Sequence, residues 1–348
     1  MLTTALIEEI LASIPHRVIG VLGDLFLDRY LELDAALTEP SLETGLDAYQ
    51  VTRVRACPGA AGTVINNLAA LGVGRIVPVS MIGDDGEGYE LRQALAAMPS
   101  VDGANLVISS QRRTPTYTKP MLGVAGGSPR ELNRLDIKNR QVLPAEVEAK
   151  ILERVDAVWP ALDVLLVLDQ VSEADCGVVT AGMRDYLALL GERVPRKIIL
   201  VDSRERISFF RNAWLKPNER ECLRGGNAAG NLREAVRQMR QSTGRPVICT
   251  QGDKGMLIEA DAGPLEVAAY PVSGPVDTVG AGDSSSAALA CALASGVALP
   301  AAAAFGNLIA SITIQQIGTT GTASPEQVRK RWREVSGSCS ASADGVPQ

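Results

Sequence analysis

Short apolar runs alternate with longer amphipathic or small-residue stretches along most of this 348-residue chain. The first run, residues 17–23, is apolar enough to predict a strand that is buried on both faces. Buried strands that alternate with helices predict a parallel sheet with helices on both sides, because a parallel connection needs a crossover of helical length. Further strands are predicted at 75–82, 164–168, 197–201, 246–250 and 256–259, and helices at 59–71, 87–98, 172–190, 232–242, 284–294, 300–317 and 325–335.

Two segments break this alternation. Residues 31–54 are polar and irregular, and residues 105–121 contain two short β-type runs, 106–108 and 116–118. We expect a small β-flap, or lid, built from about 31–56 and 105–122, followed by a glycine-rich turn at 123–128. Such a flap has one apolar face that must be covered by a ligand, by the core or by another chain, and a homodimer through the lid is the hypothesis that follows from the last of these.

The remaining chain is expected to form one α/β domain over residues 1–335. Residues 336–348 are rich in Ser, Gly and Ala and predict a disordered tail. The first 14 residues mix acids with apolar residues, which indicates an amphipathic helix and not a signal peptide. Breaks at Gly296 and Pro300 argue against a membrane span in the apolar region 284–317.

Charge and cysteine usage exclude several kinds of partner. The net charge is −6 and no run of Lys or Arg stands out, so we expect no nucleic-acid partner. The six cysteines are scattered, without a Cys-x-x-Cys pair, which predicts reduced thiols in the cytoplasm and no zinc site.

His16 is the only histidine, so Ser-His or Cys-His catalysis is all but excluded and any general base is expected to be Asp or Glu.

The run Asp277-Thr278-Val279-Gly280-Ala281-Gly282-Asp283 lies directly before an expected helix. Two glycines allow a sharp turn that directs backbone N–H groups at one point, and the helix start adds about half a positive charge. Together they predict an anion site, most naturally for phosphate. Asp283 beside such an anion is suited to accept the proton of an attacking hydroxyl. An ordinary loop-to-helix turn with an Asp cap is the alternative.

Three weaker patterns accompany this run. Asp24 and Asp28 follow the first strand, at the edge where open α/β sheets bind ligands. Asn218 and Glu221 share a face of a first helical turn and could hold a hydrated Mg²⁺, although a helix start capped by Asn218 is the favoured interpretation of this motif taken alone. Residues 250–255 link two strands through glycines that allow the close approach of a ligand, or simply form a turn. These features suggest phosphoryl transfer without naming a substrate.

Together these motifs resemble the ribokinase (PfkB) family of carbohydrate kinases. The 277–283 run resembles the family's C-terminal signature, and Lys216-Pro217-Asn218-x-x-Glu221 resembles its Asn-x-x-Glu motif. Thr250-x-Gly252-x-x-Gly255 resembles its nucleotide-side turn, and residues 57–72 resemble its N-terminal glycine motif. Within the family, Gly23 to Tyr30 and Arg134-Leu135-Asp136 are most similar to the kinase domain of bacterial heptose-7-phosphate kinase/adenylyltransferases, and no nucleotidyltransferase domain is expected to follow.

The resemblance implies a ribokinase-like three-layer α/β/α sandwich with a mostly parallel sheet and a small β-lid. It implies ATP-dependent phosphorylation of a sugar or sugar-phosphate hydroxyl, with Mg²⁺ and, as in many members, K⁺. The residues implied by the resemblance fall into four groups. They are Asp283 as base with Gly280, Ala281 and Gly282 as anion hole; Asp24, Asp28, Gly59, Thr63 and Arg134 on the sugar side; Thr250, Gly252, Gly255 and Asn307 on the ATP side; and Asn218 and Glu221 for Mg²⁺, with Asp277 for a monovalent cation.

Departures from the family pattern fall on the sugar side. The paired glycine is Gly59-Ala60, the usual Asn corresponds to Thr63, and the subgroup's Asp-Tyr-x-Lys-Gly is replaced by residues 169–173. The reaction class is therefore better defined than the acceptor. A nucleoside kinase of the same superfamily and a non-catalytic sugar or nucleotide sensor remain as alternatives. A Rossmann dehydrogenase is the weakest alternative, because no Gly-x-Gly-x-x-Gly opens the helix after the first strand.

Overall fold

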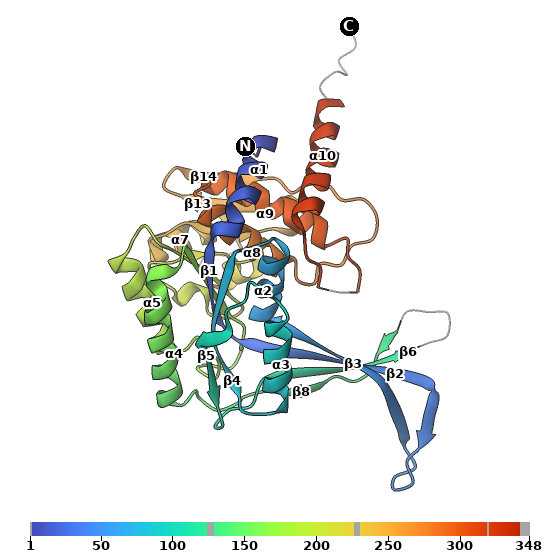
Figure 1. The fold of residues 1–348 in the computed structure, drawn as a ribbon. Coiled ribbons are helices and arrows are strands. Elements are labelled where there is room, and N and C mark those ends of the chain that lie inside the picture. The colour runs from blue at the N-terminus through green and yellow to red at the C-terminus, as the bar shows by residue number, and fades with distance from the viewer. Residues whose placement is uncertain (1, 124–128, 226–229, 319, 342–348) are drawn as a thin grey trace.

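A nine-stranded sheet forms the centre of the protein (Figure 1). The structure is a computed structural model that describes residues 2–123, 129–225, 230–318 and 320–341. The strand order is β14-β13-β12-β11-β10-β9-β1-β4-β5, parallel from β12 to β5 and antiparallel at the β13 and β14 edge. The bounds are β1 (Val18–Gly23), β4 (Arg75–Gly83), β5 (Leu106–Ser109), β9 (Val164–Asp169), β10 (Ile198–Ser203), β11 (Trp214–Leu215), β12 (Val247–Thr250), β13 (Met256–Ala260) and β14 (Gly263–Val267).

Helices cover both faces of this sheet, so the predicted three-layer α/β/α architecture is confirmed. Alternate residues of β9 point to opposite faces: Leu166 and Leu168 belong to one apolar cluster, and Leu165 and Val167 to the other. The first cluster is completed by α1 (Thr4–Ser13), α2 (Ala61–Ala70), α3 (Gly86–Ala96), α8 (Ala281–Ala294), α9 (Leu299–Thr313) and α10 (Pro325–Ala341). The second is completed by α4 (Ala145–Val158), α5 (Ala181–Arg193), α6 (Glu219–Gly225) and α7 (Leu232–Thr243).

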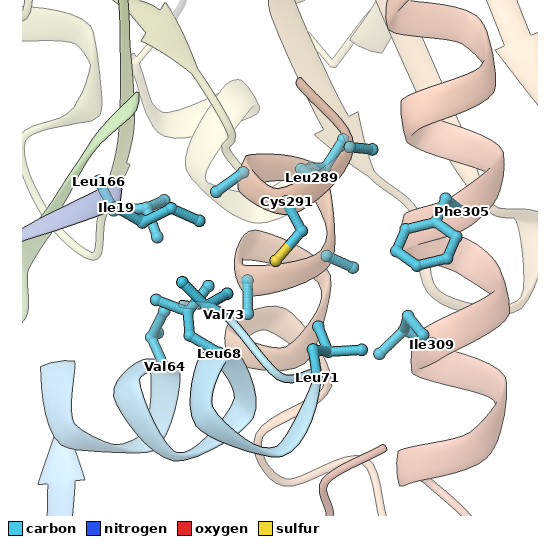
Figure 2. Packing of buried hydrophobic residues seen from close by; sticks show 14 of the residues in the cluster. Ile19, Val64, Leu68, Leu71, Val73, Leu166, Leu289, Cys291, Phe305 and Ile309 are labelled. Atoms are coloured by element: carbon cyan, nitrogen blue, oxygen red, sulfur yellow. The ribbon is translucent and has the colours of Figure 1, made fainter. Parts of the chain in front are cut away.

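Helix α8 is held tightly between its neighbours. Figure 2 shows Leu289 and Cys291 of α8 between Leu68 of α2 and Phe305 and Ile309 of α9. Every α8 residue from position 284 to 293 is buried, and most are Ala or Ser. Small side chains allow close approach on all sides of the helix. This packing fixes the position of the α8 N-terminus, which follows the glycine-rich run.

The lid is a separate five-stranded sheet that extends away from the body (Figure 1). Its strands are β2 (Leu25–Pro40), β3 (Asp47–Ala60), β6 (Thr116–Gly123), β7 (Arg130–Glu131) and β8 (Leu135–Ile137). Strands β2 and β3 form a long antiparallel pair, and β6 runs parallel to β2. The lid therefore begins at Leu25, directly after the first strand of the body and earlier than the predicted residue 31.

The run at residues 106–108 was predicted to belong to the lid, and this prediction is wrong. These residues form β5, which pairs with β4 at the edge of the large sheet. Val107 is buried in the core on the α4 side. A short apolar run fits a lid strand and an edge strand equally well, and only the tertiary pairing distinguishes them.

The helix predicted at residues 172–190 begins later than expected. Helix α5 begins at Ala181, with the side chain of Thr180 capping its N-terminus. The preceding segment is a loop, whose backbone N–H groups at Gln170, Val171 and Val178 donate to the carboxylate of Asp24. A distant side chain thus satisfies the polar backbone groups that a longer helix would have paired.

Other elements also differ from expectation. Helix α4 and strand β14 were not predicted, and α10 continues to Ala341, into the segment where a disordered tail was predicted. Residues 342–348 and most of the predicted glycine-rich turn at 123–128 lie outside the described residues. Among the helices that the structure describes, none is long and apolar enough to cross a membrane.

Candidate active site

Polar residues meet where the parallel strands of the large sheet end. Val201 of β10 pairs with Leu215 of β11, so Asp202 and Lys216 lie side by side at the carboxyl ends of these strands. The Lys216 Nζ atom lies 2.8 Å from Asp202 Oδ2. Ser286 of α8 donates to the same carboxylate oxygen over 3.3 Å. This hydrogen bond connects helix α8 directly to the polar edge of the sheet.

Gly280 makes the turn that starts helix α8. Its φ angle is +80°, in the left-handed region that favours glycine. A Cβ atom at this position would lie 2.7 Å from Thr320 Cγ2 and 3.8 Å from Thr63 Cγ2. Both the backbone angle and the close approach therefore require glycine here. Thr63 of α2 thus lies against the turn, and its predicted sugar-side role stays a prediction.

The backbone N–H groups of this turn are mostly available to a ligand. The Ala281 N–H donates to Thr278 O over 3.2 Å, so its predicted place in the anion hole is occupied internally in this structure. Within the described ranges, the N–H groups of Gly280, Gly282 and Asp283 have no backbone or side-chain acceptor. These three donors and the positive end of α8 form the candidate anion site.

Asp283 is the third residue of α8 and carries the candidate catalytic carboxylate. Burial, together with the nearby negative charge of Asp202, raises its pKa to about 7, although Lys216 and Arg204 act in the opposite direction. No hydrogen bond to this carboxylate is present in the part of the chain that the structure describes. A carboxyl group whose pKa lies near neutrality, with its oxygens free, is suited to accept a proton from a hydroxyl.

Asp202 and Lys216 were not among the predicted site residues. Lys216 appeared only as part of a motif, and Asp202 directly follows the predicted strand at 197–201. The signal that pointed to Asp24, a polar residue just beyond a buried strand, applied equally to Asp202. The pairing between β10 and β11, which brings the two side chains together, could not be deduced from sequence spacing.

Asn218 and Glu221 form a reciprocal cap at the start of α6. The Glu221 N–H donates to Asn218 Oδ1 over 2.9 Å, and the Asn218 N–H donates to Glu221 Oε2 over 2.8 Å. This arrangement is the capping box that stabilises helix N-termini. The structural alternative raised by the sequence is therefore present. It leaves Glu221 Oε1 free, so the cap does not exclude a second role.

The oxygens at this edge fit a hydrated Mg²⁺. Asp202 Oδ1 and Glu221 Oε1 accept no hydrogen bond from the described residues, and both are the hard oxygen donors that Mg²⁺ prefers. Burial and the nearby Asp202 charge raise the pKa of Glu221. The described residues contain no cluster of three or more His, Cys, Asp or Glu side chains able to hold a metal.

The residues predicted on the ATP side lie close to this edge. Thr250 forms a β-bridge with Asn218, and its N–H donates to Pro217 O over 2.9 Å. Gly255 has a φ of +94°, and a Cβ there would lie 2.1 Å from Val267 O, so glycine is required. Asn307 is buried, and its amide donates to Val267 O and to the next carbonyl, each over 3.0 Å. Asn307 therefore holds β14 in place.

The turn between β12 and β13 completes this side. Gly252 begins a short helical turn, residues 252–254, with a φ of +60°. No heavy atom lies within 4 Å of a Cβ built at Gly252, so the backbone faces open space. The predicted turn with accessible glycine backbone is present. Gly252 is free for a ligand to approach, whereas Gly255 is needed for packing.

On the lid side, Asp28 and Gly59 lie next to each other on paired strands. A Cβ at Gly59 would be 2.8 Å from Asp28 Oδ2, so glycine leaves room for this carboxylate. Lys119 Nζ lies 3.3 Å from Asp28 Oδ1 and donates to Tyr30 Oη over 3.2 Å. A carboxylate and an ammonium on one lid face can bind the hydroxyl groups of a sugar.

Arg134 occupies the outer part of the same face. Its guanidinium makes two hydrogen bonds to Asp136, of 2.6 and 2.8 Å, and lies 4.2 Å from the centre of the Tyr117 ring. The Tyr117 ring packs edge-on against Phe26, with 5.2 Å between ring centres. Arg134 is thus held by Asp136 and Tyr117, and its positive charge is already partly neutralised.

Asp24 has a structural role in this arrangement. Its carboxylate is buried and accepts three backbone N–H groups from the loop after β9, at 2.6 to 3.2 Å. Burial raises its pKa, against the opposing effect of these hydrogen bonds. The residue predicted to lie near the sugar therefore shapes the wall of the site, with both carboxylate oxygens engaged.

Asp277 is also engaged by the backbone. Its carboxylate accepts the Val279 N–H over 3.0 Å and the Gly318 N–H over 3.1 Å. These bonds tie the turn before α8 to the chain after α9. The predicted monovalent-cation role of Asp277 stays a prediction.

A cavity of about 90 Å³ lies where the lid meets the ends of β1 and β9. Phe26, Tyr117, Gln170 and Arg204 are among its lining residues, and Asp24 is the one predicted sugar-side residue in its lining. The positive charge of Arg204 acts to lower the pKa values of both Tyr117 and Asp283. The cavity is a candidate acceptor pocket, and Arg204 is the lining residue that connects it electrostatically with Asp283.

Comparison with known proteins agrees with this geometry. The model of the pfkB family carbohydrate kinases matches residues 211–327, which include the Asn-x-x-Glu motif, the 250–255 turn and the 277–283 run. The chain contains a pfkB-family carbohydrate kinase domain. Two curated relatives are the "Bifunctional protein HldE" of Bradyrhizobium diazoefficiens, 27% identical over 330 residues, and that of Pelobacter propionicus, 31% identical over 329 residues.

The similarity to these relatives extends over most of this chain but not over most of theirs. It covers 93% and 92% of this chain, and 64% of the length of each relative.

Two solved structures show the same fold. Phosphofructokinase-2 from Escherichia coli in complex with potassium has a TM-score of 0.66 at 19% identity, covering 92% of this chain and 99% of its own. Ribokinase from Arabidopsis thaliana complexed with ribose and ATP has a TM-score of 0.64 at 17% identity, covering 90% and 98%. The fold of this chain is therefore ribokinase-like.

Proposed function

We propose that this protein transfers the γ-phosphoryl group of ATP to a hydroxyl group of a sugar or sugar phosphate. The observation that carries the proposal is the Asp283 carboxyl. Its pKa is raised to about 7, and it lies at the start of a helix whose Gly280 and Gly282 N–H groups have no acceptor among the described residues. Few arrangements other than acid–base catalysis beside an anion need a half-buried carboxylate in this position.

In the proposed reaction, Asp283 accepts the proton and backbone N–H groups stabilise the transferred phosphoryl group. Asp283 takes the proton from the acceptor hydroxyl as its oxygen attacks the γ-phosphorus, and the bond from that phosphorus to the β,γ-bridging oxygen breaks to release ADP. The free N–H groups at Gly280, Gly282 and Asp283 stabilise negative charge on the phosphoryl oxygens in the transition state. Mg²⁺ at Asp202 and Glu221 would neutralise charge on the nucleotide phosphates when bound.

The acceptor is proposed more narrowly from the lid. Asp28 and Lys119 place one negative and one positive group on the face that the acceptor would contact. The resemblance of residues 23–30 to heptose-7-phosphate kinases makes a heptose 7-phosphate the first acceptor to test. Of the altered residues 169–173, positions 170–173 are part of the lining of the candidate pocket, which favours including other sugars in the same test.

The Asp283→Asn variant tests the mechanism. Loss of a general base typically lowers the rate by about 10²–10⁴. We expect turnover of the variant to fall by this order while ATP binding persists, because the amide isostere retains the fold. Asp84→Asn is a matched control, since Asp84 is an exposed carboxylate outside the site. Unchanged turnover in Asp283→Asn would exclude the mechanism.

The acceptor is identified by measuring ADP formation against a panel of heptose 7-phosphate, hexoses, pentoses, their phosphates and nucleosides. A preferred nucleoside would assign the protein to nucleoside kinases of the same superfamily. Binding of ATP without ADP formation from any acceptor would favour a non-catalytic sensor. Repeating the assay with K⁺ exchanged for tetramethylammonium examines the cation proposal at Asp277.

The lid also carries the proposed homodimer interface. A bulge at Thr52 shifts the register so that Val51 pairs with Leu33 and Val54 pairs with Leu31, which places these four apolar side chains on one lid face. Val51 and Val54 are each 47% exposed. This face points away from the Asp28 side, so a second copy could cover it without closing the acceptor site.

A further inference from the structure

Lys216 is the most deeply buried cation at the candidate site. Its side chain is only 3% exposed. The ammonium has three N–H donors, and one is directed at Asp202 Oδ2. No other acceptor for this ammonium is present within the described ranges. Buried charged groups normally have their donors engaged, and the described residues offer no acceptor for the two remaining donors, which are therefore available to a bound anion.

The surroundings of Lys216 keep it charged. Burial acts against the charged ammonium, but the carboxylates of Asp202, Glu221 and Asp283 outweigh this effect and raise its pKa. The ammonium therefore remains positive throughout the neutral pH range. Lys216 is a fixed positive charge placed among three acids at the strand ends.

The open side of the ammonium faces the amide turn. Lys216 Nζ lies 3.9 Å from the position of a Cβ built on Gly282, and no other described heavy atom from outside the adjoining part of α8 lies within 4 Å of that position. Gly282 itself is exposed. An anion seated on the Gly282 and Asp283 N–H groups would therefore come within reach of Nζ, without an intervening side chain at Gly282.

We propose that Lys216 contacts the transferred phosphoryl group directly and supplies, with the backbone N–H groups of the turn, the positive charge that stabilises it. This inference rests on the proposed kinase function. The proton of the acceptor hydroxyl still goes to Asp283, and the electron pair of the broken P–O bond goes to ADP. Lys216 therefore forms and breaks no covalent bond in this step. Its role is electrostatic, at the oxygens of the moving phosphoryl.

A purely structural role is the competing explanation. In that case Lys216 only neutralises Asp202, and its loss would affect fold stability and all nucleotides alike. A contact with the transferred phosphoryl has a different signature. It strengthens binding of a nucleotide that carries a γ-phosphoryl group and leaves ADP binding nearly unchanged.

Calorimetric titration of the full chain with Mg²⁺ plus AMP-PNP, and separately with Mg²⁺ plus ADP, distinguishes the two roles. In Lys216→Met we expect AMP-PNP to bind about 10- to 100-fold more weakly, as for loss of a charged hydrogen bond, while ADP binding changes little. With the acceptor from the panel, kcat should fall by about 10²–10³, as for loss of one preorganised donor. Lys197→Met, at a half-buried lysine beside Trp159, is the matched control.

Each outcome is decisive. Equal weakening of both nucleotides, or no weakening of either, overturns the role of Lys216. If Lys216→Met does not fold, Lys216→Arg carries the same test. It keeps the charge beside Asp202 but replaces the compact ammonium with a planar group. A contact role predicts a changed AMP-PNP to ADP affinity ratio, and an unchanged ratio refutes it. Failure of the wild-type protein to bind either nucleotide would instead contradict the proposed function.

Discussion

At the scale of single residues, the site depends on a carboxyl group held where its ionised form is disfavoured. Asp283 combines burial with the nearby charge of Asp202, and its pKa rises to about 7. A base whose pKa is near the working pH is deprotonated in a large fraction of the molecules and is still basic enough to accept a proton efficiently. The same environment should therefore govern both the activity and the stability of the protein.

The pH dependence of kcat/KM should follow the ionisation of Asp283. Only the deprotonated carboxylate can accept a proton, so kcat/KM is expected to level off above a pH of about 7 and to fall tenfold per pH unit below it. A pH series with saturating Mg²⁺ and the preferred acceptor measures the midpoint. A plateau that continues down to pH 5 would show that Asp283 is not the group that titrates.

The same shift predicts a gain in stability when Asp283 is neutralised. Its pKa is about 7 in the folded protein, raised from an ordinary value of 3.8, so between these values the folded state holds a proton that the unfolded state has released. Ionisation therefore lowers the free energy of unfolding as the pH rises through this range. Asp283→Asn should have a higher Tm than wild type at pH 8, and this gain should shrink at pH 4. A Tm difference that is independent of pH would contradict the assignment.

At the scale of elements, helix starts carry much of the candidate chemistry. Helix α8 begins at the Gly280 turn, and α6 begins with the reciprocal Asn218–Glu221 cap. The first leaves N–H groups free, whereas the second pairs them within the motif. Two helix starts with similar sequence signals are therefore suited to different tasks. One can bind an anion, and the other orients a carboxylate.

Variants at α6 separate capping from metal binding. Asn218→Ala removes the cap and should destabilise the protein by about 1 kcal/mol, measured by denaturant unfolding. Glu221→Gln keeps an acceptor for the Asn218 N–H but removes the charge. We expect its stability to stay close to wild type while the Mg²⁺ concentration for half-maximal activity rises. A Glu221→Gln variant with unchanged Mg²⁺ dependence would assign Glu221 to capping alone.

At the scale of the whole molecule, the lid extends beyond the body, which consists of the large sheet and the helices on its two faces. It extends from the large sheet, and its residues include several exposed apolar side chains (Figure 1). The body is complete by itself, with an apolar cluster on each face of the sheet. A second copy of the chain is the covering partner that we propose for the face with Val51 and Val54.

Light scattering at micromolar concentration should give the mass of two chains. Replacing Val51 and Val54 with Asp places charges on the proposed interface and should give the mass of one chain. Leu189→Asp, at an exposed apolar residue of α5, is the matched control and should stay dimeric. A single-chain mass for the wild-type protein, or a dimer that survives both Asp substitutions, would refute the lid interface.

The sequence alone determined the fold class and the place of the anion turn. Buried runs such as 164–168 and the glycines around Gly280 restrict the backbone locally, and local restrictions can be read without a structure. Most strands and helices were therefore predicted close to their observed bounds. The 106–108 run and the loop at 170–180 were not, because strand pairing with β4 and backbone hydrogen bonds to the Asp24 carboxylate determine their structure.

Only the tertiary structure decided which polar residues share the site. The pairing of β10 with β11 places Asp202 beside Lys216, although they are 14 positions apart, and the packing of α8 brings Asp283 near both. The tertiary structure also showed that the Asp24 carboxylate accepts hydrogen bonds from three backbone N–H groups, which the spacing of residues along the sequence could not reveal. Charges act through space, so their partners depend on how strands and helices pack and not on their order along the chain.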